Sequence, residues 1–551
     1  MYYTAEQVIK AKRRLDRIFA PSSNKDPRGS DSEDFSGDND NSPKGAESTP
    51  PMTKAGREGH GIERSKRGRN EVEDESDEDL DDDGYAVEGD AVGASTEGSE
   101  SPEDPDDEDY SVERDAGDST ADEEGGEEEI DAREGTREEG EEISDGEELE
   151  QIVLRETNRE GLSTCGSKWK NMDETNLRAY IGLLLLAGMY RSRGEATSSL
   201  WEAEQGRPIF RATMSLKEFH RWSKTLRFDD RKNRGVDGDP RDKLAAIREV
   251  WSKWSERLPA LYNPGPAVTV DERMVPFKGR CSFRQYMPNK PAKYGLKLWV
   301  ACDAASSYAW RMQAYTGKES PLASDGRTTA KPEVKLASRV VLDLTRGLKH
   351  RLVTCDNFFT SYELAHRLRC NGVDLLGTIR SNRLELPHEL TSARGRKVFS
   401  SKFAFTELAT LISYVPKRNK TVVLLSTRHS TPEINADCNK MKPQAILDYN
   451  RTKGGVDNLD KLLATYSCRR MTKRWPVAMF HNILDVSAYN AYVIWRETHP
   501  ELMAGTRNRR RLFLGQLGKE LVTPLILRRG HAPRAQSARM LVAAMRGGGH
   551  G

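Results

Sequence analysis

The sequence predicts a mixed α/β fold, in which a sheet of parallel and antiparallel strands is flanked by helices and preceded by an acidic segment. Residues 1–150 hold 17 basic and 50 acidic residues (net −33), whereas residues 151–551 hold 69 basic and 37 acidic residues (net +32). Apolar residues recur with helical spacing over 151–262. Over 267–381 the pattern changes to apolar runs of strand length separated by turn residues.

The acidic segment, residues 1–148, is rich in Ser, Gly, Pro, Asp and Glu and poor in aromatic residues. It buries too little apolar surface to offset chain entropy, so we expect it to be disordered. It is either a solubilising spacer or an anion that competes with nucleic acid for the basic remainder of the chain. The basic cluster RSKRGR at 64–69 is typical of nuclear import signals, and we expect a nuclear protein.

Composition excludes two classes of protein. The longest apolar run, Tyr180 to Tyr190, is too short to cross a bilayer, and the N-terminus lacks the apolar core of a secretory signal. The seven cysteines are spread singly, with no Cys-x-x-Cys pair, so we expect reduced thiols and no structural zinc. The positive charge of residues 151–551 instead indicates a polyanionic partner such as nucleic acid.

A helical domain is expected over 149–264. The run 176–192 has the apolar density of a buried helix, and the runs 215–230 and 242–258 interleave basic residues with apolar positions at helical spacing. Three of these basic residues are either phosphate contacts or part of a solvated helix face: Arg221, Lys224 and Arg227.

The sheet follows the turn NPGP at 263–266 and is expected over 265–382. Three strand-like runs precede a strand, helix and strand, in chain order 267–277, 296–304, 308–317, 350–359, 361–372 and 373–381. Three antiparallel strands followed by a strand–helix–strand unit predict a mixed five-stranded sheet of RNase H-like topology.

The rest of the chain is divided into four parts. Residues 383–443 are irregular with short β-like runs, and we expect an insertion subdomain there. Residues 444–466 return to helical patterning and are expected to complete the core. Residues 467–530 are expected to form a second helical, DNA-binding part, and 531–551 a flexible basic tail.

Three aspartates lie within or at the ends of predicted strands and helices. Asp271 lies within the first strand run, Asp356 ends the fourth, and Asp457 opens a helix at GGVDNLDKLL. If folding gathers them, three hard oxygen donors repel one another unless divalent cations bind, and two Mg²⁺ there would activate a nucleophile for in-line displacement at a phosphodiester. Asp460, three residues further on, is either a partner of these carboxylates or an alternative ligand. Asp303 also follows an apolar run, and nothing local excludes it.

Two groups of cations accompany the carboxylates. A basic hairpin is suited to DNA phosphates and contains Arg280, Arg284, Lys290, Lys293 and Lys297. A second group surrounds an indole on which unpaired bases would stack: Arg469, Arg470, Lys473, Arg474 and Trp475. The alternative for the hairpin is a surface strand with solvated lysines, and the alternative for Trp475 is a buried anchor at a helix start.

Four blocks of the chain, 211–230, 270–303, 353–380 and 449–495, resemble the signature blocks of the piggyBac transposase family, including its domesticated, transposable-element-derived members. The resemblance implies an RNase H-like DDE/D core with Asp271, Asp356 and Asp457 as catalytic metal ligands and Asp460 as a further acidic position beside them. It implies two Mg²⁺ ions, for which Mn²⁺ substitutes. It also makes 149–264 a dimerisation and DNA-binding domain.

The same resemblance implies cut-and-paste transposition by a homodimer that binds double-stranded DNA. The family cuts at the terminal inverted repeats of an element, forms hairpin ends and joins them at TTAA. One departure is that members of the family continue into a Cys-rich zinc-binding module, whereas residues 501–551 hold no Cys and ten Arg or Lys against two Glu.

Three functions therefore stay open at this level. The first is a nuclear DNA transposase, favoured by the intact carboxylates. The second is a domesticated DNA-binding protein without cutting activity, favoured by the missing Cys-rich end. The third is a chromatin scaffold whose acidic segment recruits basic partners.

Overall fold

The computed structural model describes residues 145–234, 242–288, 290, 292–317, 336–383, 386–435, 440–502 and 505–547. All of them belong to one compact unit of the chain. Residues 1–144, which include most of the expected disordered segment and the basic cluster at 64–69, lie outside the described residues.

The first part of the described chain is helical, as its periodicity predicts. Its α-helices are α2 (Asp145–Cys165), α3 (Glu174–Met189), α4 (Thr197–Leu200), α5 (Pro208–Thr213), α6 (Leu216–Thr225) and α7 (Arg248–Arg257). Helix α3 begins at a capping box, in which the Asp173 carboxylate accepts from the backbone N–H of Asn176 and the Asn176 side chain accepts from that of Asp173. Most of α3 is buried, as expected from its apolar density.

A single mixed sheet follows. Its strands are β1 (Ala267–Pro276), β2 (Gln285–Tyr286), β3 (Tyr294–Asp303), β4 (Ala309–Ala314), β5 (Leu352–Cys355), β6 (Asp374–Thr378), β7 (Ser401–Phe405), β8 (Thr410–Lys417) and β9 (Lys420–Ser426). Strands β1, β3 and β4 pair antiparallel, and β1, β5 and β6 pair parallel. The mixed strand directions and the strand–helix–strand unit, with α9 (Tyr362–Cys370) between β5 and β6, agree with the sequence-based expectation.

The size of the sheet differs from the expected five strands. The strand order is β2-β3-β1-β5-β6-β9-β8-β7, with β4 on the outer side of β3, and it makes nine strands in the described chain. Strand β9 pairs antiparallel with β6, Leu376 opposite Ser426 and Thr378 opposite Leu424. The segment 383–443, which also holds α10 (His388–Thr391), therefore extends the sheet at this edge. This pairing satisfies backbone groups that β6 would otherwise expose at an edge.

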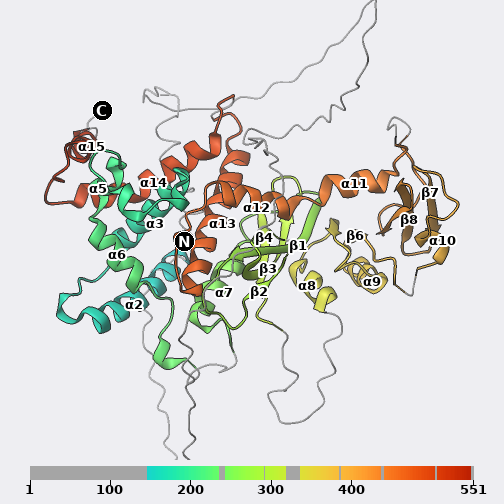
Figure 1. The fold of residues 1–551 in the computed structure, drawn as a ribbon, viewed down its shortest axis with the longest axis horizontal. Coiled ribbons are helices and arrows are strands. Elements are labelled where there is room, and N and C mark those ends of the chain that lie inside the picture. The colour runs from blue at the N-terminus through green and yellow to red at the C-terminus, as the bar shows by residue number, and fades with distance from the viewer. Residues whose placement is uncertain are drawn as a thin grey trace, which may run out of the picture. The chain divides into compact units, whose positions relative to one another are not determined.

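Helices after the sheet complete the core. Helix α8 (Leu336–Leu344) contacts β3 and β4, and α11 (Gln444–Thr452) contacts β1, β6 and β9. Helix α12 (Gly455–Thr465) packs on β1 and β3, and the long buried helix α13 (Trp475–Thr498) runs beside them (Figure 1).

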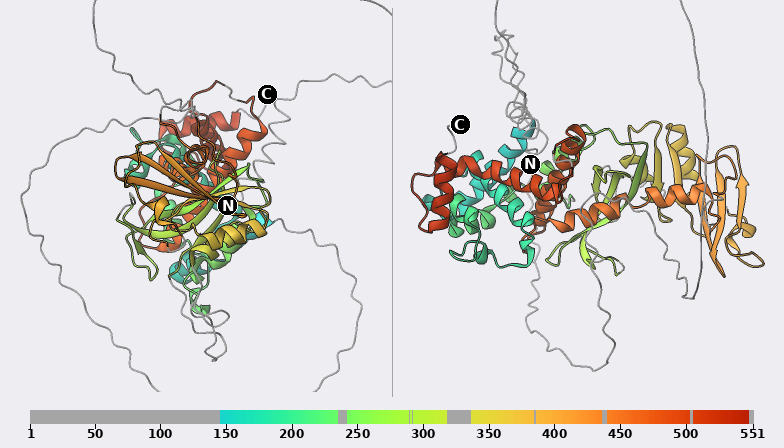
Figure 2. Two further views of the ribbon diagram at one scale, coloured as in Figure 1. Left: turned by 90° about the vertical axis from the view of Figure 1, so that its right-hand side faces the viewer. Right: turned by 90° about the horizontal axis from the view of Figure 1, so that it is seen from above.

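The C-terminal part returns to the helical region (Figures 1 and 2). Helix α14 (Arg509–Arg528) packs along α3 at a close crossing, where a Cβ added to Gly182 would lie 2.8 Å from Leu521. Residues 531–551 were expected to be flexible, but Gln536–Gly547 form α15, which packs on α5. Ala538, Leu541, Val542 and Met545 supply its apolar stripe.

Candidate active site

Asp271 and Asp356 are neighbours across the parallel strands β1 and β5. Val270 on β1 lies opposite Cys355 on β5. Asp271 is the next residue after Val270, and Asp356 is the next residue after Cys355. Residues two apart on a strand share a face, so the two carboxylates lie on the face that carries Thr269 and Thr354. Two of the three predicted positions are thus brought together by strand register alone.

The third carboxylate is brought to the same face by the turn between α11 and α12. The Thr269 hydroxyl donates to the backbone oxygen of Thr452 at 2.5 Å, and the hydroxyls of Thr354 and Thr452 lie 2.7 Å apart. Gly455, the first residue of α12, lies against Thr269, because an added Cβ would be 2.6 Å from the Thr269 hydroxyl oxygen. These contacts hold the first turn of α12, which carries Asp457, over the strands that carry Asp271 and Asp356.

Burial and mutual repulsion act on the carboxylates. Burial, with smaller contributions from the charges of Asp356 and Asp457, raises the pKa of Asp271 to about 7, although the Glu272 backbone N–H and Lys290 oppose the increase. Burial also raises the pKa of Asp356, with Glu272 adding to the increase and the Phe358 backbone N–H opposing it. The site therefore penalises the fully ionised form of its own side chains.

This donor chemistry fits a hard divalent cation. Among the described residues, no three His, Cys, Asp or Glu side chains are arranged to hold a metal ion as they stand. The carboxylates of Asp271, Asp356 and Asp457 nevertheless supply the oxygen ligands that Mg²⁺ prefers, and a dication would relieve the repulsion that raises the Asp271 pKa. The binding of two Mg²⁺ ions by these side chains stays a prediction.

Asp460 lies beside the site but has a partner of its own. Arg273 on β1 donates to its carboxylate at 2.6 Å and to the Asn482 side chain at 2.8 Å. Arg273 is two residues beyond Asp271 on the same face of β1. Asp460 therefore links α12 to β1 through a buried guanidinium, and its predicted role as a ligand stays a prediction.

Asp303, which sequence reasoning could not exclude as a site residue, has a structural role. It accepts from the backbone N–H of Gly265 at 2.7 Å, from the N–H of Ser306 at 2.7 Å and from the Ser306 hydroxyl at 2.8 Å. These bonds stabilise the turn after β3, which explains why a second aspartate follows an apolar strand.

The cations of the predicted basic hairpin divide into two groups. Lys297 forms an ion pair with Glu272 at 2.6 Å and lies 3.8 Å from the centre of the Trp299 ring. Lys290 donates to the backbone oxygen of Glu272 at 3.0 Å. The remaining three side chains are exposed on the surface: Arg280, Arg284 and Lys293.

The second cationic group is mostly occupied by protein contacts. Arg470 donates to the backbone oxygens of Ser192 and Glu195, and Arg474 donates to those of Lys224 and Ser223. Arg469 donates to the backbone oxygen of Pro276 at 3.2 Å, and Trp475 packs edge-on against Phe283 with ring centres 5.0 Å apart. Lys473 is exposed. The phosphate and base contacts proposed for this group stay predictions.

Arg380 is a site residue that sequence reasoning missed. It lies two residues after the end of β6, which pairs with β5, and its guanidinium donates to the Asn357 side chain at 3.3 Å. Its charge lowers the pKa of Asp356. The signal in the sequence was an arginine two residues after the end of the strand next to β5.

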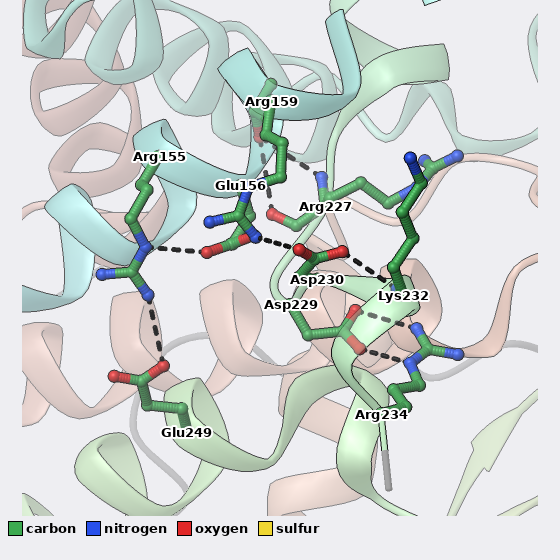
Figure 3. Close-up of polar contacts among 10 residues, drawn as sticks. Arg155, Glu156, Arg159, Arg227, Asp229, Asp230, Lys232, Arg234 and Glu249 are labelled. Carbon is green, nitrogen blue, oxygen red and sulfur yellow. Dashed lines mark hydrogen bonds and ion pairs between the residues drawn. The ribbon is translucent and has the colours of Figure 1, made fainter. Parts of the chain in front are cut away.

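In the helical region, many arginines are paired with carboxylates (Figure 3). Arg159 on α2 pairs with Glu156 at 2.6 Å and with Asp230 at 2.9 Å, and Arg227 pairs with Glu160 at 2.5 Å. Arg227 therefore stabilises the helical region by pairing its guanidinium with the Glu160 carboxylate.

The described fold, a mixed sheet covered by helices, is that of a transposase core. Residues 145–492 match the family model described as "Transposase IS4". The chain belongs to the piggyBac transposase family.

Named relatives agree with this assignment. The human "PiggyBac transposable element-derived protein 3" is 24% identical over 317 residues, which cover 55% of this chain and 52% of that protein. The human "PiggyBac transposable element-derived protein 2" is 23% identical over 246 residues, covering 41% of this chain and 40% of that protein. The match thus spans about half the length of these curated relatives or less.

A solved structure shares the fold. A cryo-EM structure of the piggyBac transposase synaptic complex with hairpin DNA matches with a TM-score of 0.65 and 30% sequence identity, over 72% of this chain and 82% of that chain. Among the described helices, none is long and apolar enough to cross a membrane.

Proposed function

We propose that this protein is a nuclear DNA transposase that cuts double-stranded DNA at the ends of an element and joins them at TTAA sites as a homodimer. The observation that carries the proposal is the convergence of Asp271, Asp356 and Asp457 from β1, β5 and α12. The match to a piggyBac synaptic complex with hairpin DNA supports a DNA substrate.

The chemistry follows from the position of these side chains. Asp271, Asp356 and Asp457 would hold two Mg²⁺ ions, which would supply an activated nucleophile and stabilise the leaving oxygen of a phosphodiester. Arg273 neutralises Asp460 and so keeps one negative charge from adding to the site. Arg380 and Lys290 place positive charge beside the carboxylates, where a DNA phosphate would approach.

A second candidate function is DNA binding without cutting. It is favoured by the human relatives, whose names describe them as derived from transposable elements. The two candidates share the DNA-binding surface and differ in whether the carboxylates catalyse.

Nicking of DNA distinguishes them. The full-length chain is incubated with Mg²⁺ and a supercoiled plasmid that carries candidate element ends flanked by TTAA. We expect nicking by the parent, none by Asp271→Asn, and parental nicking by Asp343→Asn, a control at a surface ion pair of α8. Equal nicking by Asp271→Asn would refute the catalytic assignment, and bound but uncut DNA with the parent would favour the second candidate.

A further inference from the structure

Two tyrosines are exposed next to each other on the β2–β3 hairpin. Tyr286 and Tyr294 lie directly opposite each other across the antiparallel pair, with ring centres 4.8 Å apart. Their exposed fractions are 56% and 43%, so both rings are open to solvent. A cross-strand aromatic pair stabilises a hairpin, but that role leaves the outer ring faces in water.

An arginine is held over this pair. The Arg284 guanidinium lies 5.5 Å from the centre of the Tyr294 ring, and it is fixed there by donating to the backbone oxygens of Lys278 and Gly279. The three side chains together present two aromatic faces and a planar cation. We call Arg284, Tyr286 and Tyr294 the aromatic platform.

The platform stands on a rigid base. Phe283 packs edge-on against Trp475 at the start of α13. A Cβ added at Gly279 would lie 2.8 Å from the backbone oxygen of Lys473, so this turn sits directly on the segment before α13. The platform is therefore preorganised, and little conformational entropy is lost when a ligand stacks on it.

Strand register places the platform in line with the candidate active site. Asp271 lies opposite Val300, and Tyr294 is six residues from Val300 on the same strand, an even spacing that keeps both on one face. At about 3.3 Å per residue, the separation along the strand is about 20 Å. At about 3.4 Å per nucleotide, that corresponds to roughly six nucleotides of a B-form strand, and an unpaired, extended strand covers it in fewer.

The charge around the platform indicates a polyanionic ligand. Residues 277–295 contain five basic residues and no acidic residue. Arg280, Arg284 and Lys293 are exposed there. Exposed aromatic faces beside exposed cations are the arrangement with which proteins bind unpaired nucleic acid, because bases stack on the rings while cations follow the backbone.

We propose that Arg284, Tyr286 and Tyr294 form a stacking site for unpaired bases of the DNA strand within roughly six nucleotides of the cleavage position. This proposal rests on the proposed function, because it takes the DNA near the carboxylates as the substrate. It makes the two tyrosines positioning residues, which distinguish a strand with unpaired bases from a fully paired duplex.

The test compares two DNA probes in buffer that contains EDTA, so that no cutting occurs. One probe is a blunt duplex, and the other is the same duplex with an unpaired TTAA extension that carries 2-aminopurine in place of one adenine. Tests with the extension on the 5′ and on the 3′ strand cover both polarities. Binding of the full-length chain is measured by titration, and stacking is read as quenching of the 2-aminopurine fluorescence.

We expect the parent to bind one extended probe at least about fivefold tighter than the blunt duplex and to quench its fluorescence. The variant Y286L/Y294L should lose both effects and keep its affinity for the blunt duplex. The variant Y286F/Y294F keeps the ring faces and should retain both effects. Phe405→Leu is the matched control, because Phe405 is 48% exposed and stacked on Phe403 at the opposite edge of the sheet.

Three results would overturn the proposal. They are a parent without preference for either extended probe, a Y286L/Y294L variant that keeps the preference, and an equal loss of affinity for both probes in that variant. The outcome is separable from that of the nicking assay. If the parent prefers an extended probe over the blunt duplex but does not nick the plasmid, cutting is refuted and the stacking site is supported. If the parent nicks the plasmid without that preference, only the stacking site is refuted.

Discussion

At the scale of single residues, Asp271 is the position where fold and chemistry conflict. Its carboxylate is largely buried, and the charges of Asp356 and Asp457 act on it, so its pKa rises to about 7. Residues that are strained by burial and by like charge are typical of functional sites. Asp303, which also follows an apolar strand, instead accepts hydrogen bonds from the backbone N–H groups of Gly265 and Ser306 and from the Ser306 hydroxyl.

Removing the charge of Asp271 should stabilise the metal-free protein. Because its folded-state pKa of about 7 exceeds the ordinary value of 3.8, the native state binds more protons than the unfolded state between these pH values. Stability is therefore lost as the pH rises through this window. At pH 8 in EDTA, Asp271→Asn should raise the free energy of unfolding by on the order of 3 kcal/mol, with no gain below pH 4.

Asp303→Asn is the matched substitution for this measurement. It weakens bonds to Gly265 and Ser306, and we expect it to lower the free energy of unfolding by about 1–3 kcal/mol at pH 8. Urea unfolding at pH 4 and pH 8 checks both variants. If the parent and the Asp271→Asn variant are equally stable at pH 8, burial does not destabilise the ionised Asp271 carboxylate.

Sequence reasoning proposed the three aspartates as a site but did not predict which side chains surround them. Asp457 was identified because GGVD opens a helix, and α12 does begin at Gly455. The role of Arg273 was out of reach, because it depends on a bond to Asp460, which lies 187 residues further along the chain. Likewise, the guanidinium of Arg470 looks like a phosphate contact in sequence and binds backbone oxygens in the structure.

At the scale of elements, the turn between α11 and α12 sets the position of Asp457. Two hydroxyls on neighbouring strands, from Thr269 and Thr354, bind Thr452 just before the turn. The two glycines that follow have different surroundings. A Cβ at Gly455 would meet the Thr269 hydroxyl at 2.6 Å, whereas a Cβ at Gly454 would meet only the Asn458 side chain at 3.7 Å.

These glycines give a matched pair of variants. Gly455→Ala should push α12 away from β1, lower the free energy of unfolding by about 1–3 kcal/mol and reduce Mg²⁺-dependent nicking beyond the loss of folded protein. Gly454→Ala should change stability by less than about 0.5 kcal/mol and leave nicking at the parental rate. Thermal unfolding and the nicking assay check the pair, and equal effects of the two alanines would show that α12 is not held by this contact.

The strands illustrate a second limit of prediction from sequence. Period and composition identified β1, β3, β4, β5 and β6 and their directions, since strand runs and the intervening helix are local features. The pairing of β9 with β6 joins residues some fifty positions apart, and nothing in the short runs of 383–443 specified that partner. For the same reason α15 was not expected, because its stripe is short and is stabilised by packing on α5.

At the scale of the whole molecule, opposite charges are separated along one chain. Residues 1–144 carry 17 basic and 46 acidic residues (net −29), and residues 145–551 carry 69 basic and 41 acidic residues (net +28). One of the two predicted roles of the acidic segment is competition with DNA for the basic part of the chain, at an effective concentration set by the linkage. This competition is electrostatic and weakens with salt.

Deleting residues 1–144 while keeping α2 tests this competition. The truncated chain should bind non-specific duplex DNA more tightly than the full chain at low salt, and the two affinities should converge as salt rises. Fluorescence anisotropy over a range of NaCl concentrations measures the effect. If the truncated and full-length chains bind DNA equally tightly at low salt, residues 1–144 do not compete with DNA, and the spacer role is the one that stays.

The central claim is that Asp271, Asp356 and Asp457 form one cation-binding pocket, and the location of bound Mn²⁺ tests it most directly. In a crystal of the full-length chain soaked with Mn²⁺, we predict anomalous density between the three carboxylates, with metal–oxygen distances of about 2.1 Å, and its loss in Asp271→Asn. Density only at other sites, or unchanged density in the variant, would contradict the claim.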